Sequence, residues 1–234
     1  MRLLTLTIFL FLSTHVISYD RILGKDFATR SEVIATNGMA ATSHPLATQT
    51  AIDVLKDGGN AIDAAIAANA VLGLVEPTGC GIGGDLFAIV WIQKDKKLYG
   101  LNSSGPAAQD MTIEKLKAMG IDKIPPFGPL PVTVPGAVAG WAALHKRFGK
   151  NSFDKLFNNA IYYADNGFPI TEVVGYYLQL SSERYKDYPN FKDVWMPNGE
   201  ALKKGDIFIN KSLAKTYKEI AKSYGESFYK GDIA

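Results

Sequence analysis

The sequence predicts a helix-rich α/β fold (α+β in its segregation of strands and helices), and three observations support that class. Residues 61–75 are almost all small or apolar, which is typical of a helix buried on every side. A β-prone run over 86–92, a charged turn and a second run over 98–101 predict a hairpin. Beyond the hairpin the chain favours helices over 111–119, 136–148, 152–166, 171–187 and 212–224.

The N-terminus has the pattern of a secretory signal peptide. Arg2 precedes an apolar run over 3–12, and small residues follow up to Ser18. The alternative is a buried or membrane helix, but a spanning helix needs about 20 apolar residues. We expect residues 1–18 to be removed, the protein to be exported to a periplasmic or extracellular space, and the mature chain to have no membrane span. Residues 33–35 are a candidate strand.

Two helices are expected before the hairpin. Ser43 to Pro45 resembles a helix start, and glycines 58–59 end that helix. Asn60 is a good N-cap for the second helix, with Asp63 in its first turn. We therefore expect 61–75 to be the central helix of the domain.

A glycine-rich segment over 79–84 joins that helix to the first hairpin strand. A dinucleotide-binding fingerprint has a strand before it and a helix after it, which is the reverse of this order. The segment instead favours close backbone approach, which also suits the wall of a pocket. Cys80 within it could be a nucleophile or a small buried residue.

The later helices have recognisable limits. Ser152, Thr171 and Ser212 stand at the starts of three of them, and Gly167 ends one. A proline-rich connection over 125–135 precedes the helix at 136–148. No repeat or low-complexity segment is visible, and no composition shift marks a domain boundary.

Composition limits the partners. The chain has 25 Lys+Arg, 23 Asp+Glu and 3 His, a formal net charge of +2, and scattered basic residues. That balance predicts no nucleic-acid partner. The single cysteine forms no internal disulfide, and no Cys/His spacing resembles a metal site, so we expect no metal and no cofactor.

Other polar residues are open to two interpretations each. His44 and His145 could form a catalytic pair or be structural, and Glu76 and Asp85 beside the glycines could be acid–base groups or solvated helix and strand ends. A polar cluster ends the hairpin, where it could contact substrate or simply form a turn. Its members Asn102, Ser103 and Ser104 are the candidate substrate-binding residues.

Several motifs in a fixed order resemble the large-subunit half of the γ-glutamyltranspeptidase family, especially its γ-glutamyltransferase-like and acylase-like branch. They cover residues 38–47, 57–65, 76–85, 134–141, 164–169 and 205–208. The resemblance extends over about residues 33–234. It implies that residues 19–234 are the large-subunit region and the N-terminal part of an N-terminal-nucleophile (Ntn) hydrolase αββα sandwich, incomplete in this chain.

The resemblance also implies an activity. Family members cut themselves, and a threonine at the start of the small subunit attacks a γ-glutamyl amide, with its own amine as base. We therefore expect a small-molecule γ-glutamyl or acyl-amide substrate and the C-terminal small subunit of the same precursor as partner. The nucleophile lies beyond Ala234, so no residue of this chain is catalytic and the chain alone should be inactive.

Two features depart from the family pattern. The chain stops inside a motif that normally continues, and so resembles a truncated product. The arginine that holds the substrate α-carboxylate in classical members aligns with Ser104, and the arginine of a subgroup aligns with Pro106. Two hypotheses follow: the N-terminal part of an acyltransferase or hydrolase, or a non-catalytic paralogue that only binds.

Overall fold

The computed structural model describes residues 32–234 and divides the chain into two units, residues 1–37 and 38–234. The predicted signal peptide over 1–18 lies outside the described residues. The predicted strand over 33–35 is wrong, because those residues are irregular and pair with no other segment described. Val33 and Ile34 are exposed, so β-prone side chains alone did not produce a strand here. The second unit is described below.

Two helices begin this unit, α1 (Pro45–Lys56) and α2 (Ala61–Val75). The predicted cap of α2 is confirmed: the Asn60 side chain accepts hydrogen bonds from the backbone N–H groups of Ile62 and Asp63. The Asp63 carboxylate in turn accepts from the Asn60 N–H at 3.0 Å. This reciprocal capping box explains why the helix begins at residue 61.

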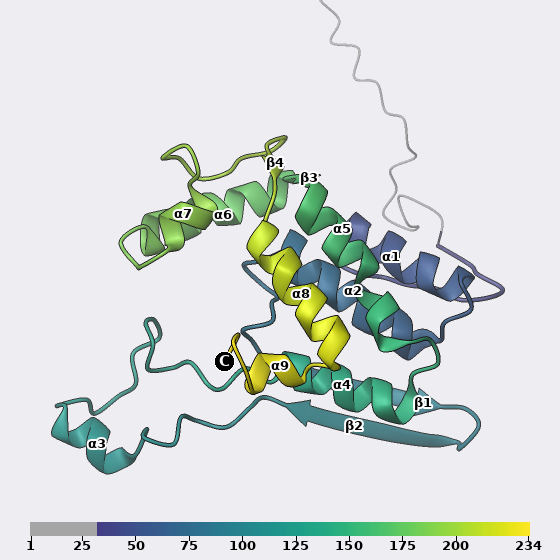
Figure 1. The fold of residues 1–234 in the computed structure, drawn as a ribbon, viewed down its shortest axis with the longest axis horizontal. Helices are drawn as coiled ribbons and strands as arrows, with labels where there is room; N and C mark the ends of the chain where they lie inside the picture. Colours follow the sequence, from purple (N-terminus) through teal and green to yellow (C-terminus); the bar gives the residue numbers. More distant parts are fainter. Residues whose placement is uncertain (1–31) are drawn as a thin grey trace, which may run out of the picture. The chain divides into compact units, whose positions relative to one another are not determined.

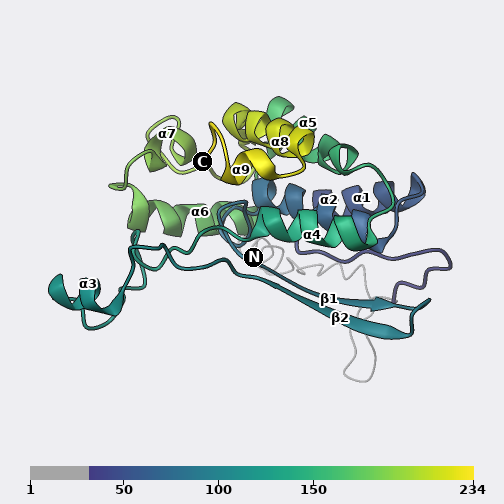
Figure 2. The ribbon, with the colours of Figure 1, turned by 60° about the horizontal axis from the view of Figure 1, so that its bottom comes forward.

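Helix α2 is the centre of the core, as predicted. Ala67, Ala70, Val71 and Val75 are fully buried, whereas Ala61 and Ala65 are exposed, so most of the α2 surface is covered. It packs against α1, α4 (Ala137–Phe148), α5 (Asn158–Asn166) and the short 3₁₀ helix η1 (Phe153–Phe157). Figure 2 shows the β1–β2 hairpin on one side of a layer that contains α1, α2 and α4, with α5 and α8 (Lys211–Ser223) on the other side. An apolar helix without a polar face fits this central position.

The hairpin has the predicted order, with β1 (Leu86–Ile92) and β2 (Lys97–Ser103) antiparallel. The register pairs Leu86 with Ser103 at one end and Ile92 with Lys97 at the other. Partly buried residues on one face pack against the core, namely Leu86, Ala88, Val90 and Leu101. The opposite face is apolar but exposed, through Phe87, Ile89, Trp91 and Leu98.

The other elements follow along the chain and are labelled in Figure 1. They are α3 (Ile113–Ala118), α4 (Ala137–Phe148), η1 (Phe153–Phe157), α5 (Asn158–Asn166), β3 (Phe168–Pro169), α6 (Glu172–Tyr185), α7 (Phe191–Trp195), β4 (Ile207–Phe208), α8 (Lys211–Ser223) and α9 (Glu226–Tyr229). The helix-rich α/β prediction is therefore confirmed.

Several limits differ from the prediction. The segment 152–166 begins as a 3₁₀ turn before it becomes α-helical. Asn210, not Ser212, caps α8, because its side chain accepts the Leu213 N–H at 2.9 Å. The short helices α7 and α9 and the two-residue pair β3–β4 were not predicted, since elements this short leave little periodicity in a sequence.

Asp63 connects distant segments of the core. Its side chain is fully buried, and besides the Asn60 N–H it accepts the backbone N–H groups of Lys150 at 3.0 Å and Asn151 at 3.1 Å. These residues follow the end of α4. The buried charge is thus compensated by backbone donors, and the start of α2 is fastened to the end of α4.

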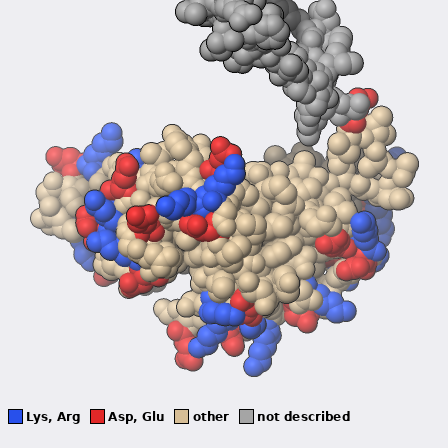
Figure 3. Space-filling model, turned by 90° about the horizontal axis from the view of Figure 1, so that it is seen from above, with Lys and Arg blue, Asp and Glu red and all other residues tan. Residues whose placement is uncertain are grey.

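Charges on the described surface are mixed. Figure 3 shows lysine and arginine side chains next to aspartate and glutamate side chains on the face that it displays. Exposed pairs include Lys204 with Glu172 at 2.8 Å and Lys203 with Glu200 at 3.2 Å. Within residues 32–234, no helix has the length and apolar character needed to cross a membrane.

Candidate functional site

The three candidate substrate-binding residues lie at the end of β2, beside the start of β1. Asn102 pairs with Phe87 and Ser103 with Leu86 in the hairpin register. The Asn102 side chain accepts the backbone N–H of Ser104 at 3.0 Å, which forms a local turn. The polar cluster is therefore both the end of a strand and a turn, as the sequence allowed.

The two serines have different surroundings. The Ser103 hydroxyl donates to the Gly136 carbonyl at 2.7 Å, so it ties β2 to the start of α4. The Ser104 carbonyl accepts the Thr133 hydroxyl at 3.1 Å. The Ser104 hydroxyl has no hydrogen bond to any described residue. The Ser104 hydroxyl and the NH₂ group of the exposed Asn102 are thus both available to a ligand, whereas the Ser103 hydroxyl is engaged.

Three segments meet at this turn with their backbones in direct contact. The Gly84 carbonyl accepts the N–H groups of Gly136 and Ala137, both at 3.0 Å. A Cβ added at Gly136 would overlap the Ser103 carbonyl, and one added at Gly105 would overlap the Val134 carbonyl. Gly105 also has φ +74°, which disfavours other residues. The close backbone contact explains why glycines occupy positions 105 and 136.

A cavity of about 410 Å³ lies along the glycine-rich segment. It is lined by Asn69, Pro77, Gly79, Cys80, Gly81, Gly83, Gly84 and Asp85. The glycine-rich segment therefore lines a pocket, as predicted. Asp85 is exposed, and its Oδ1 lies 3.4 Å from the Thr133 hydroxyl that also reaches Ser104. From the sequence, Asp85 is expected beside the glycines only. The contact with the substrate-binding candidates runs through Thr133, which is distant in the sequence.

Glu76, Ser43, His44 and Cys80 form a second polar group near the end of α2. The Ser43 hydroxyl donates to the Glu76 carboxylate. Burial lowers the pKa of His44, and the negative charge of Glu76 opposes that shift. Burial raises the pKa of the Cys80 thiol, and Glu76 raises it further. A raised thiol pKa disfavours the thiolate that a nucleophile needs. Cys80 is nevertheless only half-buried and lines the cavity, so it is not the fully buried small residue of the other interpretation.

The two histidines do not form a pair. His44 caps α1, where its Nδ1 accepts the Leu46 N–H at 3.2 Å. His145 binds the Asn151 carbonyl through Nε2 at 2.7 Å and the Tyr224 hydroxyl through Nδ1 at 2.5 Å. Because a carbonyl only accepts, the His145 Nε2 must carry a proton. His145 therefore has partners at both ring nitrogens, which agrees with the structural interpretation. His44 has one at Nδ1, while its buried Nε2 has no partner among the described residues.

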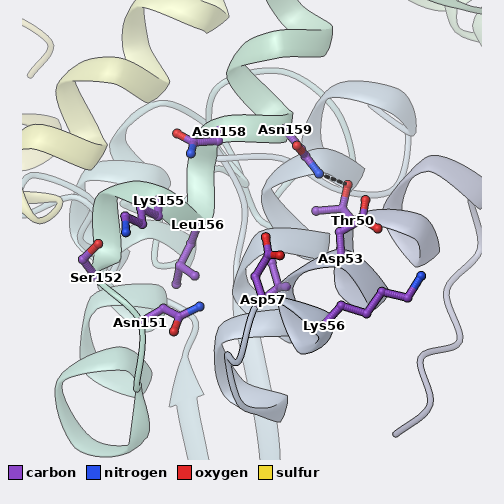
Figure 4. Close-up of a pocket in the computed structure, with 11 residues that line it drawn as sticks. Thr50, Asp53, Lys56, Asp57, Asn151, Ser152, Lys155, Leu156, Asn158 and Asn159 are labelled. Atoms are coloured by element: carbon purple, nitrogen blue, oxygen red, sulfur yellow. Dashed lines mark hydrogen bonds between the residues drawn. The ribbon is translucent and has the colours of Figure 1, made fainter.

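A larger cavity lies elsewhere in the described part of the chain. It measures about 690 Å³ and lies between α1, η1 and α5 (Figure 4). Its lining is mostly polar and carries both signs of charge, with Asp53, Asp57, Lys56 and Lys155. Asn159 donates to the Thr50 hydroxyl across it at 3.2 Å. None of the residues predicted to bind substrate lines this cavity, so size alone does not make it the candidate site.

Metal ligation finds no support in the described part of the chain. No group of three or more His, Cys, Asp or Glu side chains in residues 32–234 is arranged to hold a metal ion.

Comparison with known sequences identifies relatives over most of the chain. A sequence model of the Gamma-glutamyltranspeptidase family matches residues 47–234. The "Glutathione hydrolase proenzyme" of Bacillus subtilis (strain 168) is 39% identical over 206 residues, which cover 86% of this chain and 35% of the relative. The "Oxamate amidohydrolase proenzyme" of Klebsiella pneumoniae is 33% identical over 211 residues, covering 87% of this chain and 39% of the relative.

Solved structures give the same result for the fold. The gamma-glutamyltranspeptidase of Helicobacter pylori superposes with a TM-score of 0.81 at 33% identity, covering 87% of this chain and 59% of that one. A cephalosporin acylase from Bacillus halodurans superposes with a TM-score of 0.83 at 42% identity, covering 92% and 41%. The chain thus spans a little over a third of the length of these curated relatives and more than half of one solved chain.

Proposed function

Because this chain belongs to the gamma-glutamyltranspeptidase family, we propose that it is the N-terminal part of a γ-glutamyltransferase or glutathione-hydrolase-like Ntn enzyme. In this proposal residues 1–18 are a signal peptide, residues 19–234 are the large-subunit region, and the protein is exported. The observation that carries the proposal is the family match over residues 47–234.

The proposed reaction uses a threonine C-terminal to Ala234, freed by self-cleavage of the precursor. Its hydroxyl oxygen attacks the acyl carbonyl carbon while its α-amine takes the hydroxyl proton. The C–N bond of the amide breaks, and the leaving amine receives that proton. Water or an acceptor amine then displaces the threonine oxygen, which gives hydrolysis or transfer.

The proposed partner is the C-terminal small subunit of the same precursor. Its docking place is the exposed face of the β1–β2 hairpin, where Ile89 is 80% and Phe87 67% exposed. Within the described residues the hairpin is a sheet of only two strands, so both of its outer edges have unpaired backbone groups. An apolar face with open edges is the kind of surface that another sheet covers.

The proposed substrate contacts come from Asn102, Ser103 and Ser104. The turn carries no cation, which weakens recognition of an α-carboxylate, because an arginine–carboxylate contact is charge-assisted and bidentate. We therefore place the protein with the acylase-like members, whose substrates are amides of other acyl groups. The chain is 42% identical to a cephalosporin acylase and 39% identical to a glutathione hydrolase proenzyme, so the neutral turn and not the identity carries this placement.

The test is to read the coding frame beyond Ala234 and express the whole precursor. We expect two fragments after self-cleavage and turnover of a chromogenic γ-glutamyl or acyl anilide. Replacement of the new N-terminal threonine by alanine should abolish both cleavage and turnover. A frame that ends at residue 234, or a full-length product that never cleaves, would support the alternative of a non-catalytic paralogue that only binds.

A further inference from the structure

We propose that Asp85 is a specificity-determining residue that makes the acyl site select substrates with an amine, and without a carboxylate, at the far end of the acyl chain. The inference rests on the proposed function, because Asp85 can act on specificity only if the turn at 102–105 borders the acyl site. It identifies the class of acyl group rather than the reaction.

The first argument is the position of Asp85 between two parts of the site. Its side chain lines the 410 Å³ cavity along the glycine-rich segment. It also stands 3.4 Å from the Thr133 hydroxyl, which lies 3.1 Å from the Ser104 carbonyl. A ligand group that reaches the turn from this cavity therefore passes close to the Asp85 carboxylate.

The second argument is that the Asp85 charge is not neutralised. Asp85 is the one charged side chain that lines the cavity among the described residues. None of the ion pairs within residues 32–234 includes it. The Thr133 hydroxyl has a single proton, so a bond to the Ser104 carbonyl leaves the carboxylate without that donor.

The third argument is that the backbone holds Asp85 in place. The preceding Gly84 carbonyl accepts two N–H groups at the start of α4, and the following Leu86 begins β1. The backbone of Asp85 is therefore fixed, so its carboxylate stays within one side-chain length of the turn. With Ser104 and Pro106 neutral, the net charge beside the turn is negative, which attracts an ammonium group and repels a carboxylate.

The experiment uses the matured full-length enzyme and three p-nitroanilides that share the same four-carbon chain from the acyl carbonyl and differ in the groups on its last carbon. γ-Aminobutyryl anilide has only the terminal amine, glutaryl anilide has only the carboxylate, and γ-glutamyl anilide has both. We expect kcat/KM for the γ-aminobutyryl substrate to exceed that for the glutaryl substrate by about tenfold, the size of a screened pair of charges near a protein surface. Asp85→Asn should bring the ratio close to one, and Asp85→Glu should largely preserve it.

The control is Asp95→Asn, in the turn at the other end of the hairpin, which should leave the ratio unchanged. As a measurement that needs no variant, added salt should lower the wild-type ratio, because salt screens exposed charges. A ratio that neither Asp85→Asn nor salt changes would overturn the inference while the proposed function stands. Absence of turnover of all three anilides would instead overturn the proposed function, and the inference with it.

Discussion

The buried carboxylate of Asp63 holds the start of α2 and the segment after α4 together. It accepts backbone N–H groups from Asn60, Lys150 and Asn151. We expect Asp63→Asn to lower the free energy of unfolding by about 2 kcal/mol, because an amide has one acceptor oxygen and its NH₂ faces further donors. Chemical denaturation of the purified protein measures this. The exposed Asp122→Asn is the matched control, and equal stability of the two variants would contradict the assignment.

His44 predicts a pH dependence. Burial holds its pKa below the ordinary value of about 6.5 in the folded state. The unfolded chain then binds the proton first as the pH falls, so stability present above pH 6.5 is lost below it. We expect His44→Asn, which keeps a side-chain acceptor at the N-cap, to flatten the decline in unfolding free energy between about pH 7 and 5. An unchanged slope would show that other groups cause the decline.

Ser104 is the position at which we predict that classical members of the family carry an arginine, so an arginine placed there tests that prediction. In the matured full-length enzyme, Ser104→Arg should lower KM for glutathione by tenfold or more, since a charge-assisted contact contributes about 1.5–3 kcal/mol. Steady-state kinetics with glutathione measure this, with the exposed Ser212→Arg on α8 as control. If the folded variant has unchanged glutathione kinetics, Ser104 is only a turn residue.

At the scale of elements, the hairpin and α4 are joined by close backbone contact at Gly136 and by the Ser103 hydroxyl, which donates to the Gly136 carbonyl. Gly136 is the N-cap of α4, and a Cβ added there would overlap the Ser103 carbonyl. We expect Gly136→Ala to reduce the free energy of unfolding by about 2 kcal/mol, because a carbonyl cannot move aside as a flexible side chain can. The same variant should impair substrate binding, since β2 would shift.

Gly100→Ala is the control for that prediction. Gly100 lies on β2 as well, but an added Cβ there has nothing within 4 Å. Denaturation midpoints of the two variants, measured side by side, separate the effect of the close contact from that of losing a glycine. Similar midpoints would mean that the hairpin and α4 can separate at little cost.

At the scale of the whole molecule, residues 19–234 produced alone should be inactive and should lack a sharp cooperative melt. We expect a broad melt because nothing in the described residues covers the exposed apolar face of the hairpin. Calorimetry and hydrogen exchange test this, with fast exchange expected in β1 and β2 and slower exchange in α2. A sharp melt of a monomer, or turnover of a γ-glutamyl anilide, would contradict the prediction.

Much of the fold could be predicted because its signals are local. The bounds of β1 follow from neighbouring residues, and the cap of α2 depends on Asn60 and the first turn of the helix. The burial of α2 could be predicted because its own sequence is apolar. The ordered motifs were likewise sufficient to identify the family, which the comparisons confirm. The strand expected at 33–35 failed because a strand needs a partner that no local pattern supplies.

The substrate-binding role of Asn102, Ser103 and Ser104 stays a prediction, and only the tertiary structure decided which residues surround them. Asp85 and Thr133 are 48 positions apart in the sequence, yet their side chains meet beside Ser104. The acceptors on Asp63 likewise find donors 87 and 88 positions away. Composition and periodicity determine which face of an element is apolar. Which two loops share a pocket depends on how the elements pack, and that packing follows from long-range contacts that no single segment contains.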